Sequence, residues 1–196
     1  IGAKPKSSLA AIEETTTYVR RILQGEEVTF YGKQVNLDKV QMTITPDVQP
    51  PLYIGGMRTK TLGLAGKIAD GAIIPAYSSP AYVRWVREQI NNDDARLVVY
   101  TAAFVHPDAE LARRVMRQRL AEWLPWGSIQ LDVLGITDDV KVAIEKHGEN
   151  LAEEIPDVWL DELTAAGSPE QVKNYVERLY EAGADCVVLE PDAYSP

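Results

Sequence analysis

Two adjacent glycines, Gly55 and Gly56, are the residues of this sequence best suited to bind a small anion. They follow an apolar run at residues 52–54 and precede a segment whose apolar residues have helical spacing. Glycines just past a strand leave backbone N–H groups uncovered, and the first N–H groups of a helix have no partner within it. A phosphate can bind at such a turn, and the alternative is that the two glycines only let the helix pack close to the strand.

The elements around these glycines form a recognisable unit. The helix is expected to begin at Thr59 or Thr61, either of which can cap it, and to end at Asp70-Gly71. A second apolar run at residues 72–74 restarts a strand. A strand, a crossover helix and a second strand predict a parallel βαβ unit. The face that the helix buries is expected to hold Leu62, Ala65, Ile68 and Ala69.

Strands and helices alternate through the rest of the chain. This order predicts a parallel α/β sheet, either open and doubly wound or part of a (β/α)8 barrel. The least regular part is residues 124–162, with one helix expected over 138–154. The other expected elements are a helix over 8–23, a hairpin over 28–37, helices starting at Ser79-Pro80, after Asp108 and at the Ser168–Gln171 capping box, and buried strands over 97–105 and 186–189.

Composition narrows the classes of protein. The 196 residues are 45% apolar and 25% charged, which suffices for one globular domain with a sizeable core. A net charge of −9 argues against a nucleic-acid partner, and the basic run at 113–119 is expected on a solvated helix face. The lone cysteine, Cys186, fits a reducing cytoplasm and a packing role. No apolar run reaches membrane length, so we expect no membrane partner.

No residue can be assigned a catalytic role from the sequence. The histidine and cysteine spacing suggests no metal site, and no nucleophile–base pair is visible. His106 precedes a proline and is interpreted as a turn residue. Glu190, after the last strand, is interpreted as a solvated carboxylate, and the tryptophans as core or interface residues.

Three segments of the chain resemble the luciferase-like flavin-dependent oxidoreductases. They are residues 1–32, residues 51–75 (PLYIGGMRTKTLGLAGKIADGAIIP) and residues 164–191 (TAAGSPEQVKNYVERLYEAGADCVVLEP). The most specific motifs are AG-x-x-ADG at residues 65–71 and GSPE at residues 167–170. The nearest branch is the deazaflavin-dependent one, which includes the methylenetetrahydromethanopterin reductases.

This resemblance implies that the chain is the C-terminal half, strands five to eight, of a luciferase-like (β/α)8 barrel. The 196 residues would form a single domain fragment, and the first half-barrel would be absent from it. Residues 1–45 would supply a helix and a small hairpin, residues 50–124 and 164–192 the barrel units, and residues 125–163 an irregular, partly helical insertion.

The resemblance also implies a cofactor site. The turn after the fifth strand would bind the cofactor phosphate, and the loop after the sixth would lie near the cofactor. Arg58-Thr59 stands where the family commonly carries Gly-Pro, so the arginine would contact the phosphate as a charged donor. The implied cofactor-binding residues are Gly55, Gly56, Met57, Arg58, Pro75, Ala76 and Tyr77.

The implied activity is hydride transfer between a deazaflavin (coenzyme F420) or FMN and a small organic substrate. Two alternatives stay open, namely an FMN-dependent luciferase-like monooxygenase and a non-catalytic half-barrel that needs a partner half. The open strand edges of a half-barrel favour pairing, so we expect a homodimer or association with the missing N-terminal half.

Overall fold

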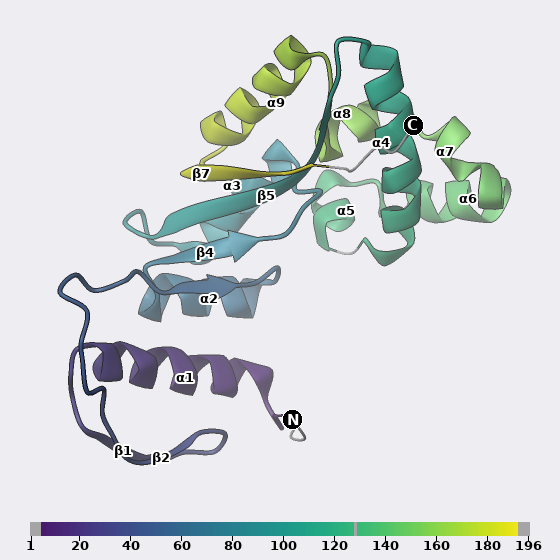
Figure 1. Ribbon diagram of the computed structural model, residues 1–196. Helices are drawn as coiled ribbons and strands as arrows, with labels where there is room; N and C mark the ends of the chain where they lie inside the picture. The colour runs from purple at the N-terminus through teal and green to yellow at the C-terminus, as the bar shows by residue number, and fades with distance from the viewer. Residues whose placement is uncertain (1–4, 128, 192–196) are drawn as a thin grey trace. The chain divides into compact units, whose positions relative to one another are not determined.

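The computed structural model describes residues 5–127 and 129–191 (Figure 1). The chain divides into two compact units. Unit 1 comprises Ile1–Ala72 and Ile90–Arg96, and unit 2 comprises Ile73–Gln89 and Leu97–Pro196. Residue 192, where the last predicted barrel unit ends, lies outside the described residues, as do residues 1–4 of the first family-like segment.

Unit 1 contains the expected N-terminal helix and hairpin. The hydroxyl of Ser7 caps the helix by accepting from the Ala10 N–H, and Gly25, at a φ of +88°, follows its end. Both predictions are confirmed, although the hairpin reaches Val40. The elements of unit 1 are α1 (Ser8–Leu23), the antiparallel pair β1 (Val28–Tyr31) and β2 (Asn36–Val40), β3 (Tyr53–Gly55), α2 (Thr59–Ile68) and the start of β4 (Gly71–Ile74).

A partly exposed carboxylate on α1 binds the turn of the hairpin. The Glu14 carboxylate accepts from the backbone N–H groups of Lys33, Gln34 and Val35 at 3.1, 2.9 and 2.9 Å. Desolvation acts to raise the pKa of Glu14, but these three donors outweigh it and hold the pKa below its ordinary value. The ring of Tyr18 also stacks on Phe30, with centroids 4.0 Å apart.

An arginine–aspartate pair, which we call the first latch, joins the N-terminal ends of unit 1's strands. Arg20 on α1 donates to both carboxylate oxygens of Asp70, at 3.3 and 2.9 Å, and to the Ile68 carbonyl at 3.2 Å. Asp70 also accepts from the Leu52 N–H at 2.7 Å. Desolvation opposes ionisation of Asp70, but the Leu52 N–H and then Arg20 hold its pKa below its ordinary value.

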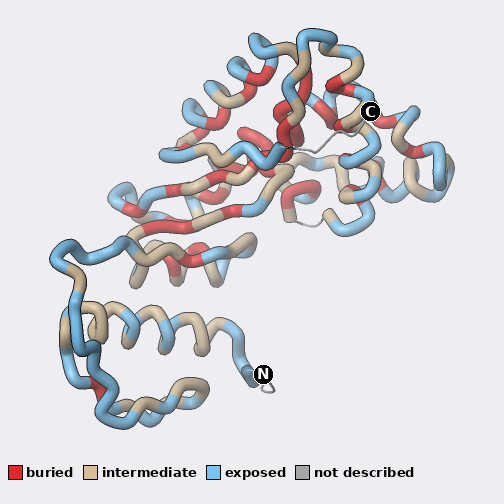
Figure 2. The backbone as a smooth tube through the Cα atoms, viewed as in Figure 1, coloured by how far each residue is buried: buried red, intermediate tan, exposed pale blue. Residues whose placement is uncertain are grey.

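The sheet of unit 2 is parallel, as the alternating order predicts. Strand β5 (Arg96–Val105) pairs with β7 (Cys186–Pro191) from Val98↔Cys186 to Ala103↔Pro191, and with β6 (Ala165–Gly167) from Ala103↔Ala165 to Val105↔Gly167. Strand β6 was not predicted. One face of β5 is buried at Leu97, Val99, Thr101 and Ala103, whereas on the other face Ala102 is buried and Val98 and Tyr100 are half-buried (Figure 2). The expectation of a strand buried on both faces is therefore met on one face and only partly on the other.

A second latch repeats the geometry of the first within unit 2. Arg87 donates to the Asp185 carboxylate and, at 2.6 Å, to the Gly183 carbonyl. Asp185 accepts from the Leu97 N–H at 2.7 Å. In both latches the arginine contacts the aspartate and the carbonyl two residues before it, while the aspartate holds the start of another strand. The repetition indicates two equivalent joints at the N-terminal ends of parallel strands.

The region expected to be irregular is mostly helical. Its largest buried side chains include Leu124, Leu131 and Leu160, which share one core cluster with Met116 and Leu120. The helix expected over 138–154 is interrupted at Gly148, which has a φ of +53°. The helical elements of unit 2 are α3 (Pro80–Ile90, whose last residue belongs to unit 1), α4 (Ala109–Trp123), η1 (Leu124–Trp126), α5 (Ile129–Leu134), α6 (Thr137–His147), η2 (Gly148–Asn150), α7 (Leu151–Glu154), α8 (Asp157–Leu163) and α9 (Pro169–Glu181).

Arg113 does not lie on a solvated face, contrary to the expectation for the run at 113–119. Only 8% of Arg113 is exposed, and its guanidinium binds Asp157 at 3.0 Å and Asp161 at 2.5 Å. Arg117 also pairs with Asp157, whereas Arg114 is exposed. Arg113 thus joins α4 to α8.

The last strand differs from the expectation in burial. Strand β7 follows α9, whose capping box at Ser168 and Gln171 is present as predicted. However, β7 carries no buried residue: Cys186 is exposed and Leu189 is 43% exposed. The predicted packing role of Cys186 is therefore wrong. Among the helices that the structure describes, none is both long and apolar enough to cross a membrane.

Candidate functional site

The two glycines at the end of β3 have different structural needs. A Cβ on Gly56 would lie 2.6 Å from Cγ2 of Thr61, so Gly56 lets the turn pack on α2. A Cβ on Gly55 would meet no atom within 4 Å, and Gly55 is exposed. Packing therefore does not require a glycine at position 55, which leaves open space beside the backbone at the end of the strand.

Helix α2 begins without a side-chain cap. Arg58 is its N-cap residue and has an extended backbone, but its side chain makes no hydrogen bond to the first turn of the helix. The expected cap at Thr59 or Thr61 is wrong, because the helix starts at Thr59 itself. The N–H groups of Thr61 and Leu62 donate to the Arg58 carbonyl at 3.0 Å. The N-terminal positive end of the helix dipole thus stands beside Met57 and an exposed Arg58.

The AG-x-x-ADG motif holds unit 1 together. A Cβ on Gly66 would lie 2.0 Å from the Ile90 carbonyl oxygen, and one on Gly71 would lie 2.2 Å from that of Arg96. The Asn92 side chain donates to the Gly66 carbonyl at 2.8 Å, and Asp70 belongs to the first latch. The motif is therefore explained by close packing and not by contact with a ligand.

The loop after β4 carries a strained aromatic residue. Tyr77 has a φ of +61°, in the left-handed region that a bulky side chain rarely adopts. Its ring stacks on Trp123, with centroids 4.5 Å apart and planes 21° from parallel. Pro75 is exposed and Ala76 half-buried. The residues expected to contact a cofactor thus fall into two groups, Gly55–Arg58 in unit 1 and Pro75–Tyr77 in unit 2, and each is considered by itself.

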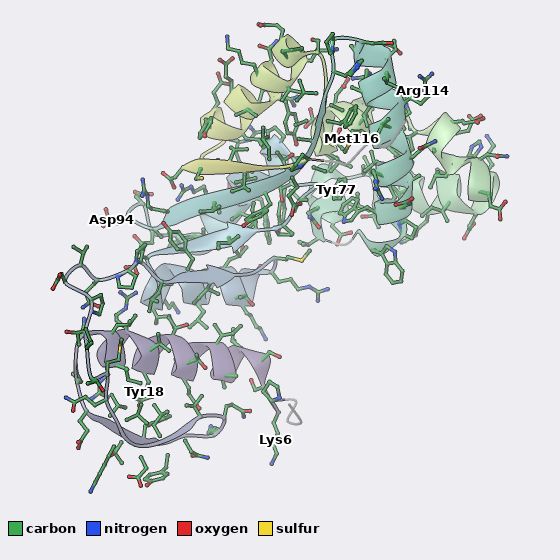
Figure 3. All side chains as sticks on the ribbon, in the orientation of Figure 1. Lys6, Tyr18, Tyr77, Asp94, Arg114 and Met116 are labelled. Atoms are coloured by element: carbon green, nitrogen blue, oxygen red, sulfur yellow. The ribbon has the colours of Figure 1, made fainter. Side chains whose placement is uncertain are left out.

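A cavity of about 360 Å³ adjoins this loop within unit 2. Tyr77 and Met116, labelled in Figure 3, both contribute to its wall. Its apolar side is completed by Ala102 and Trp123, and Arg119, Glu122 and Glu190 add charge. Arg119 and Glu122 pair at 3.2 Å and are about half and two thirds exposed, so they form a wet rim. The cavity is therefore lined by aromatic and other apolar side chains together with charged ones.

The sequence of the chain matches the profile of a family described as luciferase-like monooxygenases over residues 1–186. The chain belongs to this family. The match covers both units and includes the glycine turn, the AG-x-x-ADG motif and the capping box.

Proteins similar to this luciferase-like chain include two reductases whose names mention tetrahydromethanopterin. A 5,10-methylenetetrahydromethanopterin reductase of Archaeoglobus fulgidus is 25% identical over 208 positions, covering 96% of the chain and 62% of that protein. The structure of a coenzyme F420 dependent tetrahydromethanopterin reductase from Methanopyrus kandleri superposes with a TM-score of 0.79 at 20% identity, covering 96% of the chain and 58% of that one.

An FMN-containing structure is also similar. The oxygenating constituent of 3,6-diketocamphane monooxygenase from Pseudomonas putida superposes with a TM-score of 0.62 at 16% identity, covering 98% of this chain and 63% of that one. At such identities the superpositions show the fold, which is α/β with a parallel sheet. The luciferase-like chain spans about three fifths of the length of these relatives.

The other residues considered in the sequence as possible site residues mostly have structural or solvent-exposed positions in this luciferase-like protein. His106 is a turn residue, as predicted, because its Nδ1 accepts from the Asp108 N–H at 3.0 Å. Glu190 is exposed, as predicted, although it also borders the cavity. Trp159 is 7% exposed and fits the predicted core role, whereas Trp126 is 82% exposed. In the described ranges no cluster of three histidine, cysteine or acidic residues could hold a metal ion.

Sequence reasoning missed two residues that contact the Tyr77 loop. Gln130 on α5 donates to the Ala76 carbonyl at 3.0 Å and is only 1% exposed. The Tyr175 hydroxyl on α9 lies 3.3 Å from the Ser78 carbonyl and 3.1 Å from that of Glu162. Gln130 stands in a segment whose apolar residues have no regular spacing, so the sequence did not indicate that its side chain is buried.

Proposed function

We propose that this chain is part of a flavin- or deazaflavin-dependent oxidoreductase and binds the cofactor phosphate at Gly55, Gly56, Met57 and Arg58. The observation that carries the proposal is the open space at Gly55, directly before a helix that lacks a side-chain cap. A glycine that packing does not require allows a ligand to approach the backbone closely. The name of the similar Methanopyrus kandleri reductase, which mentions coenzyme F420, supports the same cofactor class.

The residues of the turn fit an anionic phosphate. The first N–H groups of α2 lack partners within the helix and its dipole favours negative charge. Arg58 stands at the position where the family resemblance expects a glycine. Its side chain would bind the phosphate directly as a charged donor, which would compensate for the backbone flexibility lost with that glycine. Both F420 and FMN carry a phosphate on the tail of their ring, so this turn does not distinguish them.

In the proposed reaction the bound cofactor supplies the hydride chemistry. The chain's own residues then bind and orient it. The glycine turn would hold the phosphate end, and Tyr77 of the Pro75–Tyr77 loop, in its own unit, would present an aromatic side chain to the ligand that it contacts. No side chain is assigned a proton-transfer role, because flavin-type hydride transfer requires little acid–base equipment from the protein.

The finer architecture belongs to the same proposal. Strands β3, β4, β5 and β7 would be strands five to eight of a (β/α)8 barrel, which needs eight. One face of β5 is only partly buried, and β7 has no buried residue. Both observations support the proposal that strands from outside these 196 residues cover them. Those strands would come from an N-terminal half or from a partner chain, and a homodimer is the simplest assembly.

Cofactor titration tests the proposal. Dissociation constants for F420, FMN and riboflavin, which lacks the phosphate, would be measured by fluorescence on the protein and on R58A, with K60A as the control for charge. Losing a charged hydrogen bond should weaken F420 and FMN binding roughly tenfold or more in R58A, because such bonds contribute about 1.5–3 kcal/mol. Riboflavin binding should not change.

A second variant tests the backbone approach. Gly55→Val should preserve folding, because nothing lies within 4 Å of the added Cβ, yet it should obstruct the phosphate. The proposal is refuted if the protein binds neither F420 nor FMN, or if both variants bind them as the wild type does. The ratio of F420 to FMN affinity decides between the deazaflavin reductase and the FMN monooxygenase.

A further inference from the structure

The strain at Tyr77 requires an explanation within unit 2. In the part of the chain that the structure describes, only two other non-glycine residues, Lys39 and Asn91, have a positive φ. Asparagine tolerates this region, and Lys39 lies in an exposed hairpin. Tyr77 is the bulky case. Strain of this kind persists only where surrounding contacts impose it, and it gathers at functional sites.

The contacts that impose it come from both sides of Tyr77. The Gln130 amide holds the preceding carbonyl, of Ala76, and the Tyr175 hydroxyl approaches the following one, of Ser78. Ser78 is fully buried, and its own hydroxyl donates to the Pro75 carbonyl at 2.7 Å. The Tyr175 hydroxyl has one proton and lies 3.1 Å from the Glu162 carbonyl and 3.3 Å from that of Ser78, so the two carbonyls share it. Buried donors therefore approach the backbone on either side of Tyr77.

The donors are suited to a permanent contact. Gln130 is 1% and Tyr175 5% exposed, so water does not compete for their hydrogen bonds. Burial raises the pKa of the Tyr175 phenol, which keeps it a neutral donor at physiological pH. Neither residue lines the 360 Å³ cavity, so any effect on a ligand there must act through the loop.

We propose that Gln130 and Tyr175 are positioning residues that hold Tyr77 in its left-handed conformation, so that its ring, braced on Trp123, forms a rigid wall of a cavity that selects flat ring systems. The ring of Tyr77 has one face on Trp123 and also borders the cavity, whose wall Met116 and Ala102 continue. A volume of about 360 Å³ lies at the low end for ligand pockets, which suits one ring system rather than a whole cofactor.

This inference deepens the proposed function, because the flat ring would belong either to the redox cofactor or to its substrate. The proposal itself rests on the geometry of unit 2 alone. It is tested with indole as a flat probe and cyclohexanol as an aliphatic ring probe, neither of which carries a phosphate. Failure here is therefore distinguishable from failure of the phosphate site.

The first experiment measures indole and cyclohexanol affinity by ligand-observed NMR on the protein and on Q130L, Y175F, Y77A and Y77F. Indole should bind more tightly than cyclohexanol. Q130L and Y175F should weaken indole about threefold to tenfold and Y77A about tenfold, the range that an aromatic contact supplies. Y77F keeps the ring and should bind indole as the wild type does.

Matched controls separate positioning from general damage. Q118L makes the same change at an exposed glutamine of α4, and Y180F removes the hydroxyl of an exposed tyrosine of α9. Neither control should alter indole affinity. Near-ultraviolet circular dichroism provides a spectroscopic readout, because the Tyr77–Trp123 stack should lose its signal in Q130L and Y175F while the far-ultraviolet spectrum is retained.

The affinities for indole and cyclohexanol and the near-ultraviolet signal together test the proposal. The proposal is overturned if cyclohexanol binds as well as indole, or if Q130L and Y175F keep both the indole affinity and the near-ultraviolet signal. Where indole selectivity is present and Y77A abolishes it, saturating F420 identifies the source of the ring. Competition with indole assigns the cavity to the cofactor ring, and additive binding assigns it to the substrate ring.

Discussion

Replacing Gly66 by alanine separates the structural explanation of the AG-x-x-ADG motif from helix propensity, because the two predict opposite signs. Gly66 lies within α2. In a helix interior alanine is favoured over glycine by about 1 kcal/mol, so propensity alone predicts that G66A stabilises the protein. The structure predicts the reverse, since the new Cβ would lie 2.0 Å from the Ile90 carbonyl oxygen.

The size of the effect follows from three contributions. Overpacking against a backbone atom costs about 1–3 kcal/mol, because a carbonyl cannot swing away as a flexible side chain does. Displacing Ile90 also strains the Asn92 bond to the Gly66 carbonyl, at 2.8 Å, which contributes about 1 kcal/mol. After the propensity gain, G66A should lower the free energy of unfolding by about 1–3 kcal/mol.

Urea denaturation followed by circular dichroism measures this difference, with thermal unfolding as a second readout. For a chain of this length each kcal/mol should lower Tm by roughly 2–4 °C. Gly55→Ala is the matched control, because its Cβ meets nothing within 4 Å, and it should change stability by less than about 0.5 kcal/mol. A G66A protein as stable as the wild type, or more stable, would refute the packing explanation.

Three further predictions concern contacts elsewhere in the two units. Asp70→Asn should destabilise the protein by up to about 1 kcal/mol at neutral pH, since the Arg20–Asp70 pair is partly exposed. Because the pKa of Asp70 in the folded state lies below the ordinary 3.8, the difference in unfolding free energy between wild type and variant should be complete above pH 3.8. In urea titrations it should disappear as the pH falls through the folded-state pKa. Arg113→Leu should cost about 1–3 kcal/mol by losing charged hydrogen bonds, whereas exposed Arg114→Leu should be nearly neutral, and equal urea midpoints would contradict the burial of Arg113. Ser168→Ala should cost about 1 kcal/mol through the lost cap of α9, with Ser168→Thr retaining most of it in the same assay.

Local signals in the sequence were sufficient for much of the fold. The apolar runs and their flanking turn residues located strands β3, β4, β5 and β7, and the serine caps located the starts of α3 and α9. Strand β6 carried no such signal. Its residues, Ala-Ala-Gly, have low β propensity and form a strand only because β5 pairs with them.

The candidate site was only partly predictable, for a similar reason. The glycine turn and the Tyr77 loop have local patterns, but Gln130 and Tyr175 reach that loop from 54 and 97 residues away. The proposed positioning of Tyr77 depends on those distant donors as well as on the local bond from the Ser78 hydroxyl to the Pro75 carbonyl. Likewise, the buried state of Arg113 depends on Asp157 and Asp161, which the pattern of the basic run does not reveal.

The two latches have a consequence for the order in which the chain can be completed during synthesis. Arg20 and Asp70 are 50 residues apart, whereas Arg87 and Asp185 are 98 apart. Closing the longer loop costs only about 0.6 kcal/mol more in chain entropy. The two latches therefore differ mainly in when their partner residues are synthesised. The N–H of Leu97 must wait for an acceptor 88 residues later. In a chain whose synthesis has stopped before Asp185, the residues of the first latch are therefore all present, whereas the Leu97 N–H at the start of β5 still lacks its acceptor.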